Sequence, residues 1–87
     1  MNGLVEMTRA LKFYGFFNIE VDASLDRSKI SHTITLSSHV HITITNNSNG
    51  ENHYSLWFVD KHIPYCMFAN SDAYQVVKQF HAMIGNI

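Results

Sequence analysis

Apolar residues recur along this chain with two different periods, and the period separates the expected helices from the expected strands. Over residues 4–14 they recur at spacings of three and four, which predicts an amphipathic helix ending at Gly15. A similar apolar stripe over residues 73–84 predicts a second helix, with Asn70 or Ser71 as its N-cap.

Between these two helices, apolar and polar residues alternate, as in strands with one buried face. The alternation predicts strands at residues 16–22, 30–36, 40–45, 53–59 and 62–68. Residues 23–29 are polar and charged and are interpreted as a connection. We expect a three-residue loop at 37–39, because it places Ile34 opposite Ile42 and lets the apolar faces coincide.

The remaining register follows from two turns. The asparagine-rich segment 46–52 is the strongest turn signal, and the matching parity pairs Ile44 with Tyr54. A tight turn at Asp60-Lys61 would then continue the core face along the last strand in Ile63, Tyr65 and Met67. Pro64 has no amide hydrogen to donate, which favours an edge position for this strand.

The length and composition fit one domain spanning residues 1–87. The 87 residues are 46% hydrophobic and 15% charged, which is typical of a globular chain. The predicted fold is α+β: an antiparallel meander sheet of four to five strands, with an N-terminal and a C-terminal helix packed on one face. The formal charge of -1 argues against a nucleic-acid partner bound through phosphates.

The compartment is inferred from what the sequence lacks. No apolar run approaches the roughly 20 residues of a membrane span, and no basic segment followed by an apolar block marks a signal peptide. The single cysteine, Cys66, fits a reducing interior. We therefore expect a cytoplasmic protein with no membrane partner.

If both helices cover one face of the sheet, the other face is open. It would carry Thr33, Thr35, His41, Thr43, Thr45, His53, Ser55, Trp57 and Cys66. Threonine favours strands in any case, so an ordinary solvated face is the simpler interpretation. Trp57, which should lie opposite His41, is the exception, because an exposed tryptophan is either covered by another segment or a contact residue.

The six histidines do not predict a metal centre. The run His39-Val40-His41 places two imidazoles on one strand face, but zinc needs three or four ligands. His53 should lie roughly 13 Å along the sheet from His41. Cys66 lacks an oriented base, and no glycine-rich phosphate loop is present. We expect no metal, no cofactor and no catalytic residues, and so not an enzyme.

The helix–sheet–helix order resembles that of double-stranded-RNA-binding domains. That resemblance would imply a lysine cluster at the start of the last helix, which grips phosphates. Here the stretch is Asn70-Ser71-Asp72-Ala73-Tyr74-Gln75, which is neutral to acidic. The phosphate-binding part of the family is therefore missing, and a nucleic-acid partner is not expected.

The segment Ile30-Ser31-His32-Thr33 is similar to the early strand of HicA-type mRNA interferases, which carries a histidine. The resemblance implies an RNase toxin in which His32 is catalytic. The chain departs from that family in lacking its glycine, its second histidine and its basic surface, and in having extra strands. This is the alternative function.

The stretch from Ile42 to Met83 resembles small phage and mobile-element inhibitors, including anti-CRISPR proteins, in its order of strand, asparagine-rich turn, strands and helix. The resemblance implies a non-enzymatic module that blocks a host protein or complex. The residues expected to contact that partner, on the open sheet face and its adjacent turn, are Trp57, His41, Thr43, His53, Asn47 and Asn49. A homodimer in which two copies pair their sheet faces or edges is a further alternative.

Overall fold

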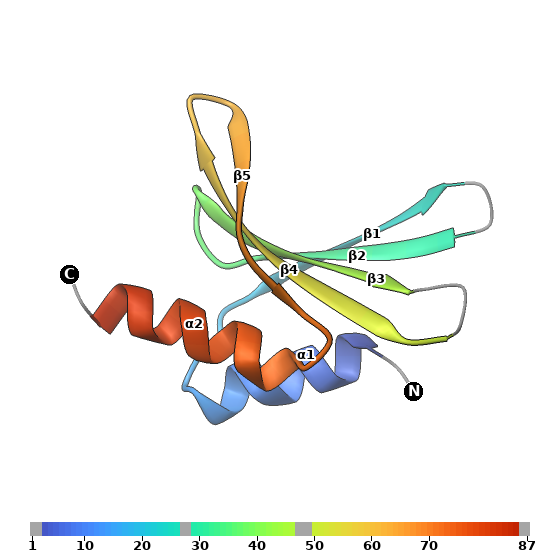
Figure 1. The fold of residues 1–87 in the computed structure, drawn as a ribbon, viewed down its shortest axis with the longest axis horizontal. Coiled ribbons are helices and arrows are strands. Elements are labelled where there is room, and N and C mark those ends of the chain that lie inside the picture. The colour runs from blue at the N-terminus through green and yellow to red at the C-terminus, as the bar shows by residue number, and fades with distance from the viewer. Residues whose placement is uncertain (1–2, 27–28, 47–49, 86–87) are drawn as a thin grey trace.

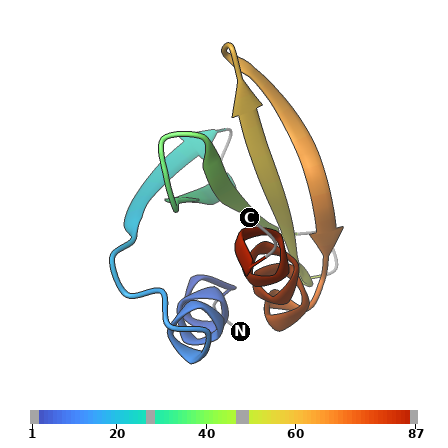
Figure 2. The ribbon, with the colours of Figure 1, turned by 90° about the vertical axis from the view of Figure 1, so that its left-hand side faces the viewer.

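The computed structural model describes residues 3–26, 29–46 and 50–85. Its elements are α1 (Gly3–Phe13), β1 (Glu20–Asp26), β2 (Lys29–Thr35), β3 (Val40–Asn46), β4 (Asn52–Asp60), β5 (Ile63–Asn70) and α2 (Ala73–Gly85). The five strands form one antiparallel sheet in the order β1-β2-β3-β4-β5, and both helices lie on the same side of it (Figures 1 and 2). The predicted α+β meander is confirmed. Neither of the two described helices, of 11 and 13 residues, has the length and hydropathy that a membrane-spanning helix needs.

The core lies between the helix pair and the middle of the sheet. It is formed by Met7, Ala10, Leu11, Ile34, Ile42, Ile44, Tyr54, Leu56, Ala73, Val76, Val77 and Phe80. The helical members recur at three and four positions and the strand members at two, so one stripe of each helix meets one face of β2, β3 and β4. Burying each large side chain contributes about 1.5–3 kcal/mol, which explains why these positions determine how the elements pack.

The central register is the predicted one. Ile34 lies opposite Ile42, and Ile44 lies opposite Tyr54. The loop of residues 37–39 joins β2 to β3, and the Leu36 amide donates to the Val40 carbonyl at 2.9 Å. Because a slip of one residue would turn every apolar side chain to the open face, burial selects this register.

The ends of the two helices follow local rules, with one correction. Gly15 adopts φ 89°, and the Phe16 amide donates to the Leu11 carbonyl at 2.8 Å, which closes α1 as a Schellman motif. The cap of α2 is Asp72, not Asn70 or Ser71, since the Asp72 carboxylate accepts the Tyr74 amide hydrogen at 3.0 Å. The Asn70 side chain instead accepts the amide hydrogen of Asp72 at 2.8 Å.

The first strand begins later than predicted. It covers Glu20–Asp26, whereas the alternation placed a strand at 16–22 and a connection at 23–29. Phe16 and Ile19 pack against the core instead, and the Phe16 ring lies 5.0 Å from that of Phe80. Polar residues could still extend the strand because pairing with β2 satisfies their backbone groups whatever the side chains are.

The last strand departs from the predicted parity. A bulge interrupts its pairing with β4, so that Trp57 lies opposite Cys66 while Leu56 lies opposite Phe68. The extra residue shifts the alternation, and Phe68 packs against the core. The expected core residues Ile63, Tyr65 and Met67 are 54%, 50% and 52% exposed. The edge position of the strand is confirmed.

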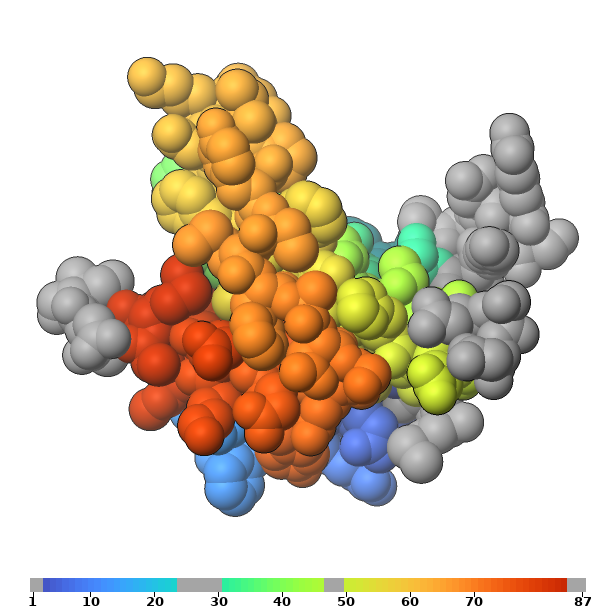
Figure 3. Space-filling model, in the orientation of Figure 1, coloured from blue at the N-terminus to red at the C-terminus, as the bar shows by residue number. Residues whose placement is uncertain are grey.

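The turn of this hairpin is one residue later than expected. Lys61 and His62 form it, with φ of 50° and 69°. Two consecutive left-handed residues are the signature of a type I′ turn, which matches the twist of the paired strands. Figures 1 and 3 show that the β4–β5 hairpin projects beyond the helices, which is why the apolar residues near its tip are left uncovered.

Candidate functional site

The candidate site lies on β3 and β4, on the positions that alternate with the core residues. In the register of these strands His41 lies opposite Trp57, Thr43 opposite Ser55 and Thr45 opposite His53. Each is half-buried except Thr45, which is exposed. These cross-strand pairs are the predicted ones. The face away from the core therefore carries hydroxyl and imidazole groups around one tryptophan.

Trp57 is held in a defined orientation on this face. Its indole N–H donates to the Thr43 Oγ1 at 2.9 Å. The His41 ring stacks against the indole, with ring centroids 6.3 Å apart and planes inclined by 13°. Trp57 is thus neither a core residue nor a free side chain: its polar group is satisfied within the sheet, while part of its ring remains accessible.

The part of the site around Trp57 is uncharged near neutral pH. Partial burial lowers the pKa of His41 below its usual value of 6.5, because desolvation disfavours the imidazolium. A neutral imidazole can stack on the indole without placing a charge against it. We name the side chains of Trp57, His41 and Thr43 the Trp57 platform.

The other predicted contact residues are not part of this platform. His53 lies at the opposite end of β4, and its backbone carbonyl accepts the Thr45 hydroxyl at 3.4 Å. Four residues along a strand correspond to about 13 Å, so His53 and Trp57 can meet one partner only if that partner spans the sheet. Asn47 and Asn49 lie outside the described residues.

The two histidines of His39-Val40-His41 do not share a face as predicted. His39 precedes β3, so strand alternation does not apply to it, and its ring lies 6.3 Å from that of Phe58. His41 stacks on Trp57, which follows the other face of β4. Among the described residues no group of three or more His, Cys, Asp or Glu side chains could hold a metal ion.

The remaining candidate for catalysis, His32, follows the core parity of β2. It is half-buried, and its cross-strand neighbours are Ala23 and Ile44. Neither neighbour is a second acid, base or nucleophile. Cys66 is exposed, and its thiol donates to the Phe68 carbonyl at 3.8 Å.

The projecting hairpin carries an apolar surface that strand parity does not predict. Phe58, Ile63, Tyr65 and Met67 are all exposed there, and we name these four residues the hairpin patch. One signal was present in the sequence: β5 contains no charged residue, whereas the opposite edge strand, β1, carries Glu20 and Asp22. Charges on an edge strand protect against association, and β5 has none.

Comparisons with protein-family models, with curated proteins and with solved structures find no significant match for this chain. The fold and the chemistry of its surfaces are therefore the basis on which a function can be inferred.

Proposed function

We propose that this chain is a non-enzymatic protein-binding module that blocks a host protein or complex through the open sheet face. The module would act as an inhibitor of the phage or mobile-element type, such as an anti-CRISPR protein. The observation that carries the proposal is the Trp57 platform: a tryptophan oriented by a hydrogen bond on a face that the helices do not cover. Tryptophan is enriched among the residues that dominate binding energies.

The platform suits binding because its side chains are already held in one conformation before a partner arrives. Association normally loses side-chain freedom at about 0.5–1.5 kcal/mol for each immobilised side chain. The hydrogen bond to Thr43 and the stack with His41 have already restricted Trp57. The surrounding hydroxyl groups can form hydrogen bonds at the rim of an interface, while the accessible part of the indole supplies its apolar centre.

The test is a tagged pull-down from nuclease-treated host lysate, read by mass spectrometry. Wild type is compared with Trp57→Ala and with Lys78→Ala, an exposed substitution on α2. We expect one stoichiometric protein with wild type and Lys78→Ala that is lost with Trp57→Ala. Retention of that protein by Trp57→Ala would remove the platform from the interface.

Folding of the variant must be shown separately, because Trp57 also contacts its neighbours. Circular dichroism and the melting temperature of Trp57→Ala provide that check. Should Trp57→Ala unfold, Thr43→Val keeps the indole and removes its hydrogen-bond acceptor. Unchanged capture by a folded Thr43→Val would then contradict a role for the oriented tryptophan.

A homodimer is a second candidate, which the hairpin patch favours. Two copies related by a twofold axis would bury their patches against each other. The hairpin patch includes Tyr65 at 50% exposure, in a strand without charge. Light scattering should then give a dimer mass for wild type and a monomer mass for Tyr65→Lys. A monomer at all concentrations of wild type would exclude this candidate.

A further inference from the structure

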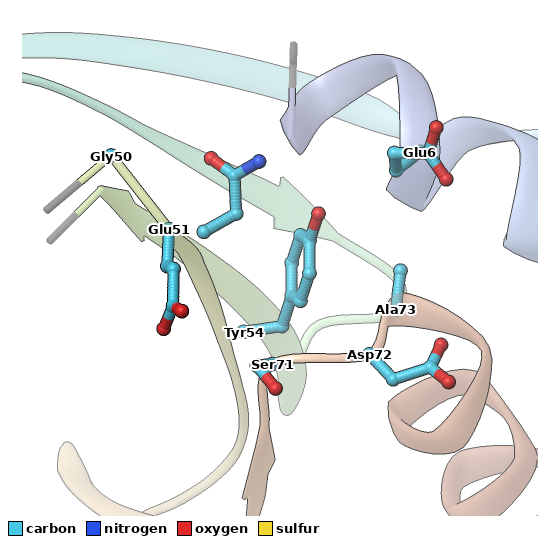
Figure 4. A pocket seen from close by; sticks show the side chains of 8 residues that line it. Glu6, Gly50, Glu51, Tyr54, Ser71, Asp72 and Ala73 are labelled. Carbon is cyan, nitrogen blue, oxygen red and sulfur yellow. The ribbon is translucent and has the colours of Figure 1, made fainter.

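A second feature lies on the helix side of the sheet, away from the Trp57 platform. A cavity of about 390 Å³ opens where α1, the start of β4 and the connection from β5 to α2 meet (Figure 4). Its volume falls within the roughly 300–1,000 Å³ of small-ligand pockets. The described residues that line it include three carboxylates, from Glu6, Glu51 and Asp72, and among them there is no lysine, arginine or histidine.

Tyr54 supplies the observation that points to a ligand. The residue is only 2% exposed and its ring belongs to the core, yet its hydroxyl group faces the cavity (Figure 4). Within the described residues the Tyr54 hydroxyl forms no hydrogen bond, and no fully buried side-chain nitrogen or oxygen lacks one. The small exposed part of Tyr54 therefore includes its hydroxyl. Buried tyrosine hydroxyls normally have a partner, and the cavity is where one would sit.

The carboxylate of Asp72 is held in place at the cavity. It caps α2 by accepting the Tyr74 amide hydrogen at 3.0 Å, and its own amide is bound by Asn70. This capping bond uses one carboxylate oxygen and leaves lone pairs on the other available to a ligand. Asp72 can therefore meet a positive group without first losing side-chain freedom.

Glu6 is paired only weakly. Among the described residues its ion-pair partner is Arg9, at 3.9 Å, and the Arg9 side chain is 68% exposed. Exposed pairs at such a distance contribute little, so Glu6 keeps most of its capacity to attract another cation. The negative potential reaches Tyr54: burial raises the pKa of its hydroxyl above 10.0, and the charges of Glu6 and Asp72 raise it further.

The spacing of these groups favours an organic cation over a metal ion. In Figure 4 the carboxyl groups of Glu6, Glu51 and Asp72 lie apart around the cavity and do not converge on one point. A metal ion needs several ligands within about 2.0–2.6 Å. An ammonium or guanidinium group on an extended stem can meet separated acceptors, and it has donors for a hydroxyl oxygen as well as for carboxylates.

We propose that this cavity binds an alkylammonium or guanidinium group, which donates to the Tyr54 hydroxyl oxygen and is neutralised by Glu6 and Asp72. That chemistry has two sources, a lysine or arginine side chain of another protein and a free polyamine. The site is independent of the proposed function, because Tyr54 and Trp57 lie on opposite faces of β4.

The test is a titration of the isotope-labelled full chain, followed by amide chemical shifts. The probes are N-acetyl-arginine amide, spermidine and N-acetyl-citrulline amide, which is the neutral counterpart of the arginine compound. We expect saturable shifts at residues 50–54 and 71–73 with a cationic probe and none with citrulline. Saturation with the arginine compound alone assigns the site to a side chain, and saturation with spermidine alone assigns it to a polyamine.

Variants locate the binding within the cavity. Glu6→Gln and Tyr54→Phe should each weaken binding of the cationic probe by about fivefold or more, since the first removes a negative charge and the second removes the hydroxyl acceptor. Asp72→Asn keeps an oxygen that can cap α2 but removes the charge, so it should weaken binding of the probe by a similar factor. The matched control is Asp22→Asn, an exposed carboxylate on β1 that should leave affinity unchanged.

Three results would overturn the proposal. They are saturable binding of the citrulline compound as tight as that of the cationic probes, no saturation by either cation, and equal weakening by Asp22→Asn and Glu6→Gln. The dispersion of the amide spectrum shows whether each variant is folded, so loss of binding is scored only on folded protein. Trp57→Ala should leave the titration unchanged, which separates this site from the proposed function.

Discussion

The indole N–H of Trp57 donates to the hydroxyl of Thr43 across two neighbouring strands, at a donor–acceptor distance of 2.9 Å. The bond is diagonal, because Thr43 lies opposite Ser55 and Trp57 lies opposite His41. A diagonal contact of this kind is within reach of an aromatic side chain on a sheet. The hydrogen bond therefore gives this face, which otherwise carries hydroxyl and imidazole groups, one aromatic side chain in a fixed orientation.

Thr43→Val should lower the free energy of unfolding by about 1 kcal/mol, because it keeps the shape of the side chain but leaves the indole N–H without its acceptor. Urea denaturation measures the change, and the emission of Trp57, the only tryptophan, should shift with it. Thr33→Val is the control: Thr33 lies opposite Thr43 on the same face, away from the indole. Equal effects of the two substitutions would contradict a specific role for this hydrogen bond.

Because of the bulge in β5, Phe68 and Met67 differ in burial. Phe68 packs against the core, whereas Met67 is 52% exposed. Phe68→Ala should therefore lower stability by about 2 kcal/mol or more, and Met67→Ala by less than about 0.5 kcal/mol. Thermal or urea unfolding of both variants decides the register. The reverse order would restore the uninterrupted alternation that the sequence predicts.

His41 should make stability depend on pH in the acidic range. Its pKa in the folded protein lies below the usual 6.5, so the unfolded chain binds the proton more readily. The contribution of His41 is therefore constant above about pH 6.5 and is lost as the pH falls from there towards the folded pKa. Urea denaturation of wild type and His41→Gln at pH 7.5 and pH 5.5 measures it. An identical pH dependence in the two proteins would show that His41 does not cause it.

The turn at Lys61 and His62 is strained for its residue types. Both adopt positive φ, at 50° and 69°, and both side chains are exposed. Replacing them together with Asn-Gly should raise the free energy of unfolding by about 1 kcal/mol, because that pair is the preferred type I′ sequence. The melting temperature is the readout. A lower melting temperature would mean that the turn is not of this type.

Much of the fold could be predicted because it depends on local periods. The spacing of Met7, Ala10 and Leu11 is enough to identify a helix and its buried stripe. Parity alone then placed Ile42 opposite Leu56, since the alternative register buries threonine and exposes isoleucine. The same parity predicts the candidate contact pair of His41 and Trp57.

The departures occur where long-range contacts compete with local pattern. Residues 16–22 follow the alternation of a strand, but Phe16 packs on Phe80 and β1 begins at Glu20. One bulge residue between Cys66 and Phe68 reverses the parity of the rest of β5. The period of apolar residues cannot predict the late start of β1 or the bulge in β5. Both depend on the surface against which the segment packs and not on the segment itself.

By itself, the sequence determined the order of the elements, the α+β class, the central register and the residues that face away from the core. Tertiary structure decided which side chains meet and which remain uncovered. It brought the indole of Trp57 to Thr43, left the hairpin patch beyond the helices, and gathered Glu6 of α1, Tyr54 of β4 and Asp72 of the β5–α2 connection at one cavity. The physical reason is that alternation is a property of neighbours along the chain, whereas a site depends on distances between segments that only packing brings together.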